Sequence, residues 1–355
     1  MARDLAPDWI LEEALGVQDT SAQWFKDQLV SMQDGKAPAY QRQDQEESKG
    51  NDGGLTLTVL GCGTMGIAIL GGILDSLASD SKDDTPTPAK LPTRFHACVK
   101  SAKGAKRVEN ELSKHKEKVQ IHQGDNLKAV QDAEVVLLGC KPQMAAGILD
   151  NDDMRAALKG KLLLSILAGV PETQLGKSLY PNGPPSQDAC TVVRAMPNTA
   201  AAVRESMTVI NISNPPLPDD TNALVIWVFT RIGKVVQLPP ANMDACTALC
   251  GSGPAFAAVF LESMAAGAIA MGVPRDEAYV MAAQTVRGTT GLMQQGEHPA
   301  VVRDKVSTPG GCTIGGLLVL EENSFRGTVS RAVREATVVA SQLGQGKQGV
   351  NGTRH

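Results

Sequence analysis

The sequence predicts an α/β fold in which a doubly wound parallel sheet is followed by an all-α region. From Leu55 onward, short apolar runs alternate with segments of helical periodicity, which is typical of parallel strands joined by crossover helices. A glycine-rich segment follows the first apolar run and opens the first helical segment. Beyond Pro240 the strand patterns end, and Ala, Met, Leu and Gly at helical spacing continue to about Leu343.

The chain divides into three predicted parts. Its 355 residues are enough for two hydrophobic cores, because single domains usually contain about 100–200 residues. The first part has short amphipathic stretches at Trp9–Leu15 and Trp24–Met32 and then becomes a polar tract that is typical of a flexible linker. The predicted boundaries are 1–54 for this partly flexible N-terminal extension, 55–239 for the sheet domain and 240–355 for the helical domain.

Eight apolar runs are predicted as strands. They are Leu55–Leu60, Arg94–Val99, Val119–His122, Glu134–Leu138, Leu162–Leu167, Thr191–Ala195, Met207–Ile212 and Lys234–Leu238. A helix is predicted near Asn222–Thr230, between the last two strands. The segments Ser79–Pro92 and Pro181–Asp188 are rich in Pro, Asp and Ser, so we predict surface insertions there.

The helices predicted for the second half are apolar over more than one face. They are Ala255–Met271, Asp276–Gln295 and Ser330–Leu343. Such helices are buried between packed helices or between subunits rather than exposed to water. We therefore expect a homo-oligomer, either a homodimer or a larger assembly.

The segment Gly61-Cys62-Gly63-Thr64-Met65-Gly66 matches the pattern GxGxxG. It follows an apolar strand and opens a helix, which is the context in which this pattern binds a dinucleotide in a Rossmann-type domain. Gly61 allows the tight turn, Gly63 allows the backbone to approach the pyrophosphate, and Gly66 allows close packing of helix and strand. The helix N-terminus, with Thr64 and Met65, then faces the phosphates. A purely structural turn is the alternative.

The end of the second predicted strand indicates which nicotinamide cofactor binds. NAD sites usually carry Asp or Glu there, next to the adenosine ribose. This strand instead ends in Lys100 and Ser101, and a cation with a hydroxyl attracts a 2′-phosphate. We predict NADPH as the preferred cofactor, with NADH as the alternative if Lys100 is only a solvated residue at a helix start.

Two further segments follow predicted strands at the edge where ligands bind in doubly wound folds. Lys141-Pro142 follows the fourth strand, and Asn198 follows the sixth within Met196-Pro197-Asn198-Thr199. We take Lys141, Pro142 and Asn198 as candidate cofactor contacts. The alternative is that both segments are ordinary loop exits.

Composition argues against several classes of partner. The net charge is −4 and aromatic residues make up 3% of the chain, so neither a basic field nor stacking platforms for nucleic acid are present. The seven cysteines lack CxxC spacing, which favours reduced thiols over a disulfide framework. Cys246 and Cys250 lie at helical spacing without a nearby His, so we assign no metal.

The sequence also predicts a cytoplasmic protein without membrane contact. No apolar run approaches the ~20 residues that span a bilayer. The N-terminal segment is acidic and lacks an apolar core, unlike a transit peptide or a signal peptide.

The run Ser307-Thr308-Pro309-Gly310-Gly311-Cys312-Thr313 stands directly before an apolar helical pattern. Pro309 fixes φ, the paired glycines allow close approach of a ligand, and Thr313 adds a hydroxyl. Free backbone N–H groups at such a helix start form an anion cradle that suits a small carboxylate. A tight turn with a helix cap is the alternative.

Together these motifs resemble the pyrroline-5-carboxylate reductases, which catalyse the last step of proline synthesis. The resemblance covers about residues 55–343 and includes Gly61–Gly66, Lys141-Pro142, Gly251–Ala255 and the block Pro299–Glu321. The residues of that last block match the family signature position by position. They are Pro299, Val302, Val306, Ser307, Thr308, Gly310, Gly311, Thr313, Gly316, Leu317, Leu320 and Glu321.

The resemblance implies a Rossmann domain that binds NAD(P) and a helical domain that dimerises. It implies that the backbone at Gly311, Cys312 and Thr313 binds the substrate carboxylate, with the Thr313 hydroxyl beside the imine nitrogen, and that Ser307, Thr308 and Gly310 belong to the same substrate site. It also places Lys100, Ser101 and Asn126 at the adenosine 2′-phosphate. The sequence departs from the family at Cys312, where Ala is common, and in its extension before Leu55 and its insertion Ser79–Pro92.

The resemblance predicts hydride transfer to the C=N bond of 1-pyrroline-5-carboxylate, which gives L-proline. A protonated imine is already electrophilic, so positioning supplies most of the catalysis, and Thr313 is the candidate catalytic residue. The rival enzyme class is a β-hydroxyacid dehydrogenase, but that class uses a lysine, and this chain has none between Lys234 and Lys305. A non-catalytic NADPH-binding regulator is a second rival, against which the intact loop before Thr313 argues.

Three other polar residues are left outside the predicted site. His298 precedes Pro299 in a predicted connecting loop, where an ordinary exposed histidine is the simpler interpretation. For Asp244 and Glu262, solvated or capping roles are the simpler interpretation, and a place at the subunit interface is the alternative.

Overall fold

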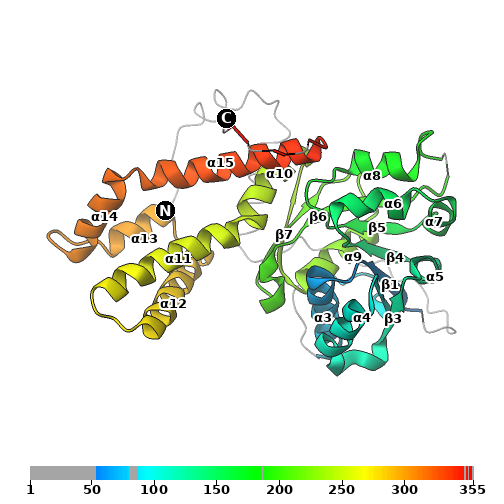
Figure 1. Cartoon of the computed structure of the whole chain (residues 1–355), viewed down its shortest axis with the longest axis horizontal. Coiled ribbons are helices and arrows are strands. Elements are labelled where there is room, and N and C mark those ends of the chain that lie inside the picture. The colour runs from blue at the N-terminus through cyan, green and yellow to red at the C-terminus, as the bar shows by residue number, and fades with distance from the viewer. Residues whose placement is uncertain (1–52, 80–86, 186, 348, 351, 354–355) are drawn as a thin grey trace. The chain divides into compact units, whose positions relative to one another are not determined.

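The computed structural model describes residues 53–79, 87–185, 187–347, 349–350 and 352–353 (Figure 1). Within these residues the chain forms two compact units, one made of residues 284–309 and the other of the remaining described residues. The predicted extension over 1–54 lies outside the described residues except for Gly53 and Gly54. The middle of the predicted insertion Ser79–Pro92 lies outside them as well.

An eight-stranded sheet forms the core of the larger unit. Its strands are β1 (Leu55–Leu60), β2 (Pro92–Val99), β3 (Val119–Gln123), β4 (Val135–Leu138), β5 (Leu162–Ser165), β6 (Thr191–Met196), β7 (Ser206–Asn211) and β8 (Gly233–Leu238). They lie in the order β3-β2-β1-β4-β5-β6-β7-β8. The chain therefore reverses its direction of travel between β1 and β4, which confirms the predicted doubly wound α/β fold.

The strand ends differ slightly from the prediction, for reasons of pairing. β1 has the predicted bounds, but β2 begins earlier than predicted because Pro92 pairs with Leu55. β5 ends at Ser165 rather than Leu167, because its neighbour β4 ends opposite it at Leu138. The apolar runs in the sequence located the strands, but the ends of each strand depend on where its neighbouring strand begins and ends.

One pair of neighbouring strands departs from the predicted parallel arrangement. β6 and β7 are antiparallel, whereas the other neighbouring pairs are parallel. Only the short 3₁₀-helix η3 (Thr199–Val203) and its flanking turns connect β6 to β7. A parallel crossover needs a dozen or more residues, so this connection is too short for one.

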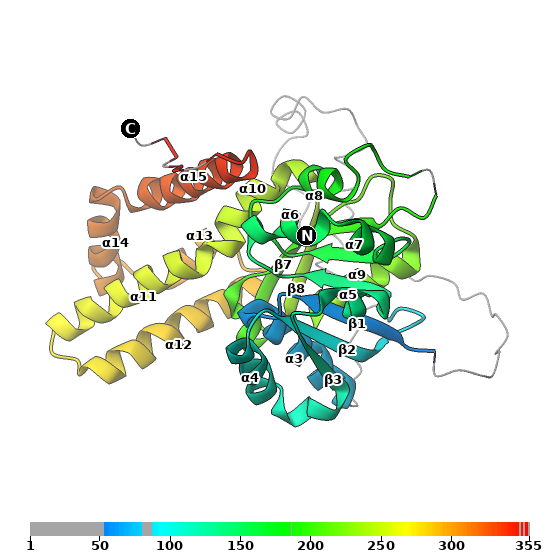
Figure 2. The same ribbon diagram turned by 45° about the vertical axis from the view of Figure 1, so that its right-hand side comes forward.

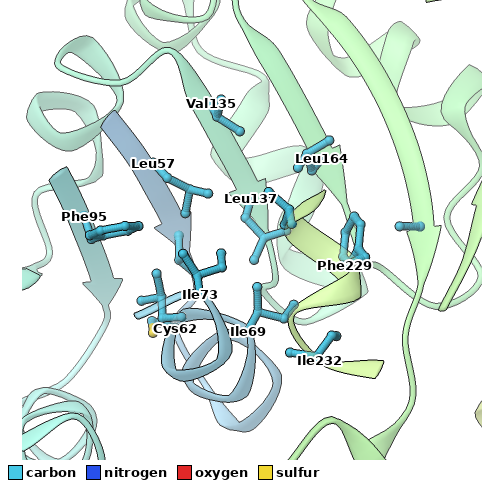
Figure 3. Close-up of a cluster of buried hydrophobic side chains, with 14 of the residues drawn as sticks. Leu57, Cys62, Ile69, Ile73, Phe95, Val135, Leu137, Leu164, Phe229 and Ile232 are labelled. Atoms are coloured by element: carbon cyan, nitrogen blue, oxygen red, sulfur yellow. The ribbon is translucent and has the colours of Figure 1, made fainter. Parts of the chain in front are cut away.

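Helices cover both faces of the sheet (Figure 2). α3 (Thr64–Ala78) and α9 (Asp219–Thr230) share one apolar core with the sheet, and Figure 3 shows Leu57, Leu137 and Phe229 within it. A second core forms with α5 (Asn126–Gln131), α6 (Ala145–Leu149), α7 (Asp152–Ala157) and α8 (Glu172–Leu179). The remaining helical elements of this part are α4 (Ala102–Glu111), η1 (Ser113–Lys118) and η2 (Pro142–Met144).

Among its described residues, the second half of the chain contains helices and connecting loops but no strand, as predicted. Its elements are η4 (Pro240–Asn242), α10 (Met243–Cys246), η5 (Thr247–Gly251), α11 (Gly253–Ala270), α12 (Arg275–Gln294), α13 (Pro299–Lys305), α14 (Cys312–Glu322) and α15 (Phe325–Gly344). Helix α15 contacts α10 and η5, and the rings of Phe260 and Phe325 lie 5.9 Å apart. Small side chains at Ala265, Ala278 and Ala282 make the local core of α11 and α12.

One helical run corrects the expectation that no segment is long enough to span a bilayer. Among the described residues, Pro240–Ala270 has the length and composition to do so, with a mean hydropathy of 1.4. The prediction began this helix at Ala255, whereas helical residues begin at Pro240 and continue through η5. A single run of this kind is weak evidence for a span, because a helix covered by another protein surface has the same composition.

Candidate functional site

The predicted cofactor residues all follow strands whose carboxyl ends share one edge of the sheet. β1 to β6 run in the same direction, so their ends meet at that edge, and β1 and β4 flank the point of reversal. The residues are Gly61, Gly63, Thr64, Met65 and Gly66 after β1, Lys100 and Ser101 after β2, Asn126 after β3, Lys141 and Pro142 after β4, and Asn198 after β6.

The three glycines of the loop after β1 differ in what a side chain would meet. Gly61 has φ +84°, and a Cβ there would lie 2.6 Å from the backbone N and Cα of Cys140. A Cβ at Gly66 would lie 2.8 Å from Cγ1 of Val59 in β1. A Cβ at Gly63 would meet no atom within 4 Å. The loop is thus closed toward the protein and open on the side of Gly63.

The N-terminus of α3 supplies groups that suit an anion. Gly63 is the N-cap and has no side chain to accept from the first N–H groups, and the first turn of α3 contains no Asp or Glu. Its leading N–H groups and helix dipole therefore remain available to a negative ligand. Together with the open backbone at Gly63, these residues fit the pyrophosphate of a dinucleotide.

The edge beside β2 and β3 is polar. Lys100 is exposed, and Ser101 is the N-cap of α4, where its Oγ accepts a hydrogen bond of 3.2 Å from the Gly104 N–H. Asn126 is the first residue of α5, and the N-cap Asp125 accepts from the Lys128 N–H at 3.4 Å. Neither residue at the end of β2 is acidic, so the structure keeps the predicted cation and hydroxyl together there.

Arg107 is a residue that the sequence analysis did not single out. It lies on α4, and its Nη2 donates a hydrogen bond of 3.1 Å to Oγ1 of Thr64 in the glycine loop. A sequence signal existed, because an arginine side chain in a helix is directed back toward the helix N-terminus and hence toward the end of β2. Spacing alone could not show that it reaches a different loop.

Both polar atoms of the Asn198 side chain form hydrogen bonds within the protein. Its Oδ1 accepts from the Ala200 N–H at 3.1 Å, and its Nδ2 donates to the carbonyl of Cys250 at 3.0 Å. It therefore ties the end of β6 to η5, where the helical half begins. By contrast, Lys141 and Pro142 are exposed at the start of η2.

The predicted carboxylate loop contains a helix N-terminus without a side-chain cap. Gly310 has φ +69°, and Gly311 is the N-cap of α14, so Cys312 and Thr313 are its first two residues. The first turn of α14 contains no acidic residue. The leading N–H groups of α14 are thus available to a carboxylate, as they are in α3.

The hydroxyl groups of this loop are in different states. Ser307 Oγ donates to the carbonyl of Arg303 at 2.7 Å, within the unit 284–309 to which Ser307 and Thr308 belong. Thr313 is half-buried, and among the described residues no protein group hydrogen-bonds its hydroxyl. Thr308 is exposed, and its hydroxyl likewise has no hydrogen-bond partner among the described residues, so the hydroxyls of Thr308 and Thr313 are both free for a ligand.

The cysteines differ sharply in environment, and all seven are free. Burial raises the pKa of the Cys62, Cys98 and Cys190 thiols to about 12. Cys312 is the exposed cysteine. Across the described ranges, no three His, Cys, Asp or Glu side chains gather as metal ligands.

Arg194 in β6 is a buried arginine whose surroundings include two carboxylates. Burial lowers the pKa of the Arg194 guanidinium, while Asp244 and Glu172 act to raise it. Glu172 Oε1 accepts from the Arg194 N–H and from Asn211 Nδ2, each at 3.1 Å. Asp244 lies in the first turn of α10 and attracts the Arg194 charge, although no hydrogen bond or ion pair joins the two side chains within the described residues.

His298 and Glu262 keep the roles that the prediction gave them. His298 is exposed and forms the N-cap of α13, where its Nδ1 accepts from the Ala300 N–H at 3.2 Å. Glu262 is exposed on α11.

Two family models match the chain, and they fall on its two halves. A model described as pyrroline-5-carboxylate reductase dimerisation matches residues 240–343. A model described as NADP oxidoreductase coenzyme F420-dependent matches residues 56–169.

Curated relatives decide the family. A pyrroline-5-carboxylate reductase of Lophium arboricola is 62% identical over 309 residues, covering 84% of this chain and 97% of that protein. The chain belongs to the pyrroline-5-carboxylate reductase family. A second member, from Neurospora crassa, is 52% identical over 321 residues and covers 85% of this chain and 97% of its own length.

Solved structures of the pyrroline-5-carboxylate reductase family share the fold. The structure from Coxiella burnetii aligns with a TM-score of 0.68 at 24% identity, covering 81% of this chain and 98% of that one. The Plasmodium falciparum pyrroline carboxylate reductase, solved with NADP bound, aligns with a TM-score of 0.66 at 24% identity and covers 82% and 98%.

Proposed function

We propose that this chain is a pyrroline-5-carboxylate reductase, which reduces the C=N bond of 1-pyrroline-5-carboxylate with NADPH and releases L-proline. Family membership over almost the full length of curated members supports this activity. The observation that carries it is the pair of uncapped helix N-termini, one at α3 after a glycine loop and one at α14 beside a free threonine hydroxyl. NADH is the alternative cofactor.

The residue assignments are part of the same proposal. The cofactor is bound by Gly61, Gly63, Thr64, Met65, Gly66, Lys100, Ser101, Asn126, Lys141, Pro142 and Asn198. The side-chain oxygen and nitrogen of Asn198 each already form a hydrogen bond within the protein. Its proposed contact with the cofactor is therefore made by its other atoms. The substrate is bound by Ser307, Thr308, Gly310, Gly311, Cys312 and Thr313.

The loop residues position the substrate for a simple reaction. N–H groups at the start of α14 hold the carboxylate, which fixes the five-membered ring, and the Thr313 hydroxyl orients the imine nitrogen and assists its protonation. The bound cofactor supplies the hydride, which adds to the imine carbon. One NADPH, one proton and one 1-pyrroline-5-carboxylate thus give NADP⁺ and L-proline.

A spectrophotometric assay tests this function. We expect NADPH oxidation with 1-pyrroline-5-carboxylate and proline-dependent reduction of NADP⁺ at alkaline pH. A β-hydroxy acid measured in parallel should give no turnover. Turnover of the hydroxy acid alone, or of neither substrate, would contradict the proposal.

Exposed apolar side chains on the helices support a homo-oligomer. Val259, Val280 and Leu318 are all more than half exposed in the isolated chain, and they lie within the part matched by the dimerisation model. Covering such side chains is favourable, so we propose a homodimer or a larger homo-oligomer.

We propose a domain boundary at 239/240, between β8 and η4. We also propose that the protein works in the cytoplasm, where its free thiols stay reduced.

Charge reversal at Lys100 should change cofactor preference. In Lys100→Glu, a carboxylate replaces the cation at the end of β2 and repels a 2′-phosphate. We expect the ratio of NADPH to NADH affinity to fall by about 10-fold or more. Dissociation constants from fluorescence titration measure this ratio, and an unchanged ratio would remove Lys100 from the cofactor site.

Alkylation of Cys312 should block the substrate loop. The other six thiols are buried or half-buried, and burial raises the pKa of each, so a thiol reagent should modify Cys312 first. A bulky adduct there displaces the carboxylate, and we expect turnover to fall by about 100-fold. L-proline should slow the modification, and Cys312→Ala should keep its own starting activity after treatment. Equal labelling with and without proline would argue that the ligand binds elsewhere.

A further inference from the structure

We propose that Arg107 determines cofactor specificity by binding the adenosine 2′-phosphate of NADPH. This inference rests on the proposed function and extends it to a residue outside the predicted site. Arg107 lies on α4, the helix that follows β2, and the end of β2 is where the adenosine ribose binds in this fold. A guanidinium reaching from α4 therefore approaches the cofactor from its ribose side.

A hydrogen bond fixes the position of the guanidinium. Arg107 Nη2 donates to Thr64 Oγ1 at 3.1 Å, although the two residues are 43 positions apart in the chain. Thr64 is the first residue of α3, so the bond holds the guanidinium beside the uncapped helix N-terminus. Four N–H groups of the fork remain for a ligand, because only Nη2 is engaged and by one bond.

The charge of Arg107 has no carboxylate partner among the described residues. Across the described residues, no carboxylate lies within ion-pair distance of Arg107, whereas Arg204 pairs with Asp75 at 2.8 Å and Arg155 pairs with Asp150 and Asp152. The Thr64 hydroxyl is neutral and leaves the charge uncompensated. A full positive charge next to the positive end of the α3 dipole is unfavourable in the absence of an anion. A bound phosphate would interact favourably with both the guanidinium and the helix N-terminus.

The two carboxylates that share a cavity with Arg107 do not neutralise its charge. Arg107, Asp75 and Glu111 line one cavity of about 380 Å³ beside α3. Asp75 already bonds to His115 at 2.7 Å and to Arg204, so it is occupied. Glu111 lies one helical turn beyond Arg107 and makes no ion pair with it.

The field of Arg107 reaches the middle of the glycine loop. Burial is the main influence on the Cys62 thiol and raises its pKa, and Cys98 adds to that rise, whereas Arg107 acts in the opposite direction. Cys62 lies between Gly61 and Gly63, but its side chain is buried in the core, so this effect shows only that Arg107 lies close to the glycine loop. Geometry and field thus agree on the same location.

The test compares binding of NADPH and NADH to the purified full-length chain by fluorescence titration, without turnover. Arg107→Gln removes the charge at similar size, and we expect its dissociation constant for NADPH to rise about 10- to 100-fold, with less than about a 3-fold change for NADH. Arg107→Lys keeps the charge but lacks the forked guanidinium, so its dissociation constant for NADPH should lie between those of the wild type and Arg107→Gln. The matched control is Lys106→Gln, which removes an exposed cation from the same helix and should change neither constant by more than about 2-fold.

The outcomes separate this inference from the proposed function. An equal loss for NADPH and NADH in Arg107→Gln, with an unchanged melting temperature, would show that Arg107 does not read the 2′-phosphate. No loss for either cofactor would also overturn the inference, and both results would leave the proposed function standing. A wild-type chain that binds neither cofactor would overturn the proposed function and this inference together.

Discussion

Replacing Thr313 by alanine should lower kcat for 1-pyrroline-5-carboxylate reduction by about 10- to 1000-fold, the loss expected for one positioned polar group. Thr313 is the second residue of α14, and within the described residues no protein group engages its hydroxyl. The backbone N–H of residue 313 persists in the variant, so carboxylate binding should survive. We therefore expect the loss in kcat to exceed any rise in KM, as steady-state kinetics with saturating NADPH can measure.

Thr313→Ser is the matched control, because it keeps the hydroxyl and removes only the methyl group. We expect its kcat to stay within about 10-fold of the wild type, whereas Thr313→Ala falls well below it. Wild-type turnover in Thr313→Ala would remove the hydroxyl from the mechanism. A rise in KM without a change in kcat would instead assign Thr313 to binding alone.

Replacing Gly61 by alanine should disrupt both the fold and cofactor binding. Residue 61 has φ +84°, and the new Cβ would lie 2.6 Å from backbone atoms of Cys140, which cannot rotate away as a side chain could. The positive φ alone costs about 1–2 kcal/mol in a residue with a Cβ. With the overlap, we expect a loss of more than about 2 kcal/mol and a fall in melting temperature of roughly 5–10 °C. NADPH affinity should fall by at least about 100-fold, because the loop that faces the pyrophosphate moves.

Two other glycines provide controls for Gly61. Gly63→Ala adds a Cβ that meets no protein atom within 4 Å, so we expect an unchanged melting temperature with weaker NADPH binding. Gly147 lies in α6, and a Cβ there also meets nothing, so Gly147→Ala should be neutral or stabilising by about 0.5–1 kcal/mol. Normal NADPH affinity in a folded Gly61→Ala protein would contradict the assignment of this loop.

The sequence predicted the sheet domain well because its signals are local. An apolar run followed by GxGxxG and a helix placed β1 to the residue and located the start of α3. The prediction was weaker where pairing with another strand sets the direction or the first residue of a strand. Examples are the antiparallel pairing of β6 with β7 and the first residue of β2. Periodicity reports which residues are buried, but it does not report the direction of a neighbouring strand.

The candidate site shows the same limit. Chain order after the second strand was enough to identify Lys100 and Ser101, and the family resemblance added Asn126 at the same edge. It could not show that the amide of Asn198 is engaged by Ala200 and Cys250, or that Arg107 bonds to Thr64. Those contacts depend on rotamers and on the distance between separate elements, neither of which appears in residue spacing.

A crystal structure of the protein with L-proline and NADP⁺ tests the central claim most directly. We expect a carboxylate oxygen of proline within hydrogen-bond distance of the N–H groups of Cys312 or Thr313, with the ring carbon facing the nicotinamide. L-proline bound elsewhere, with the N-terminus of α14 empty, would contradict the claim that this helix start holds the substrate.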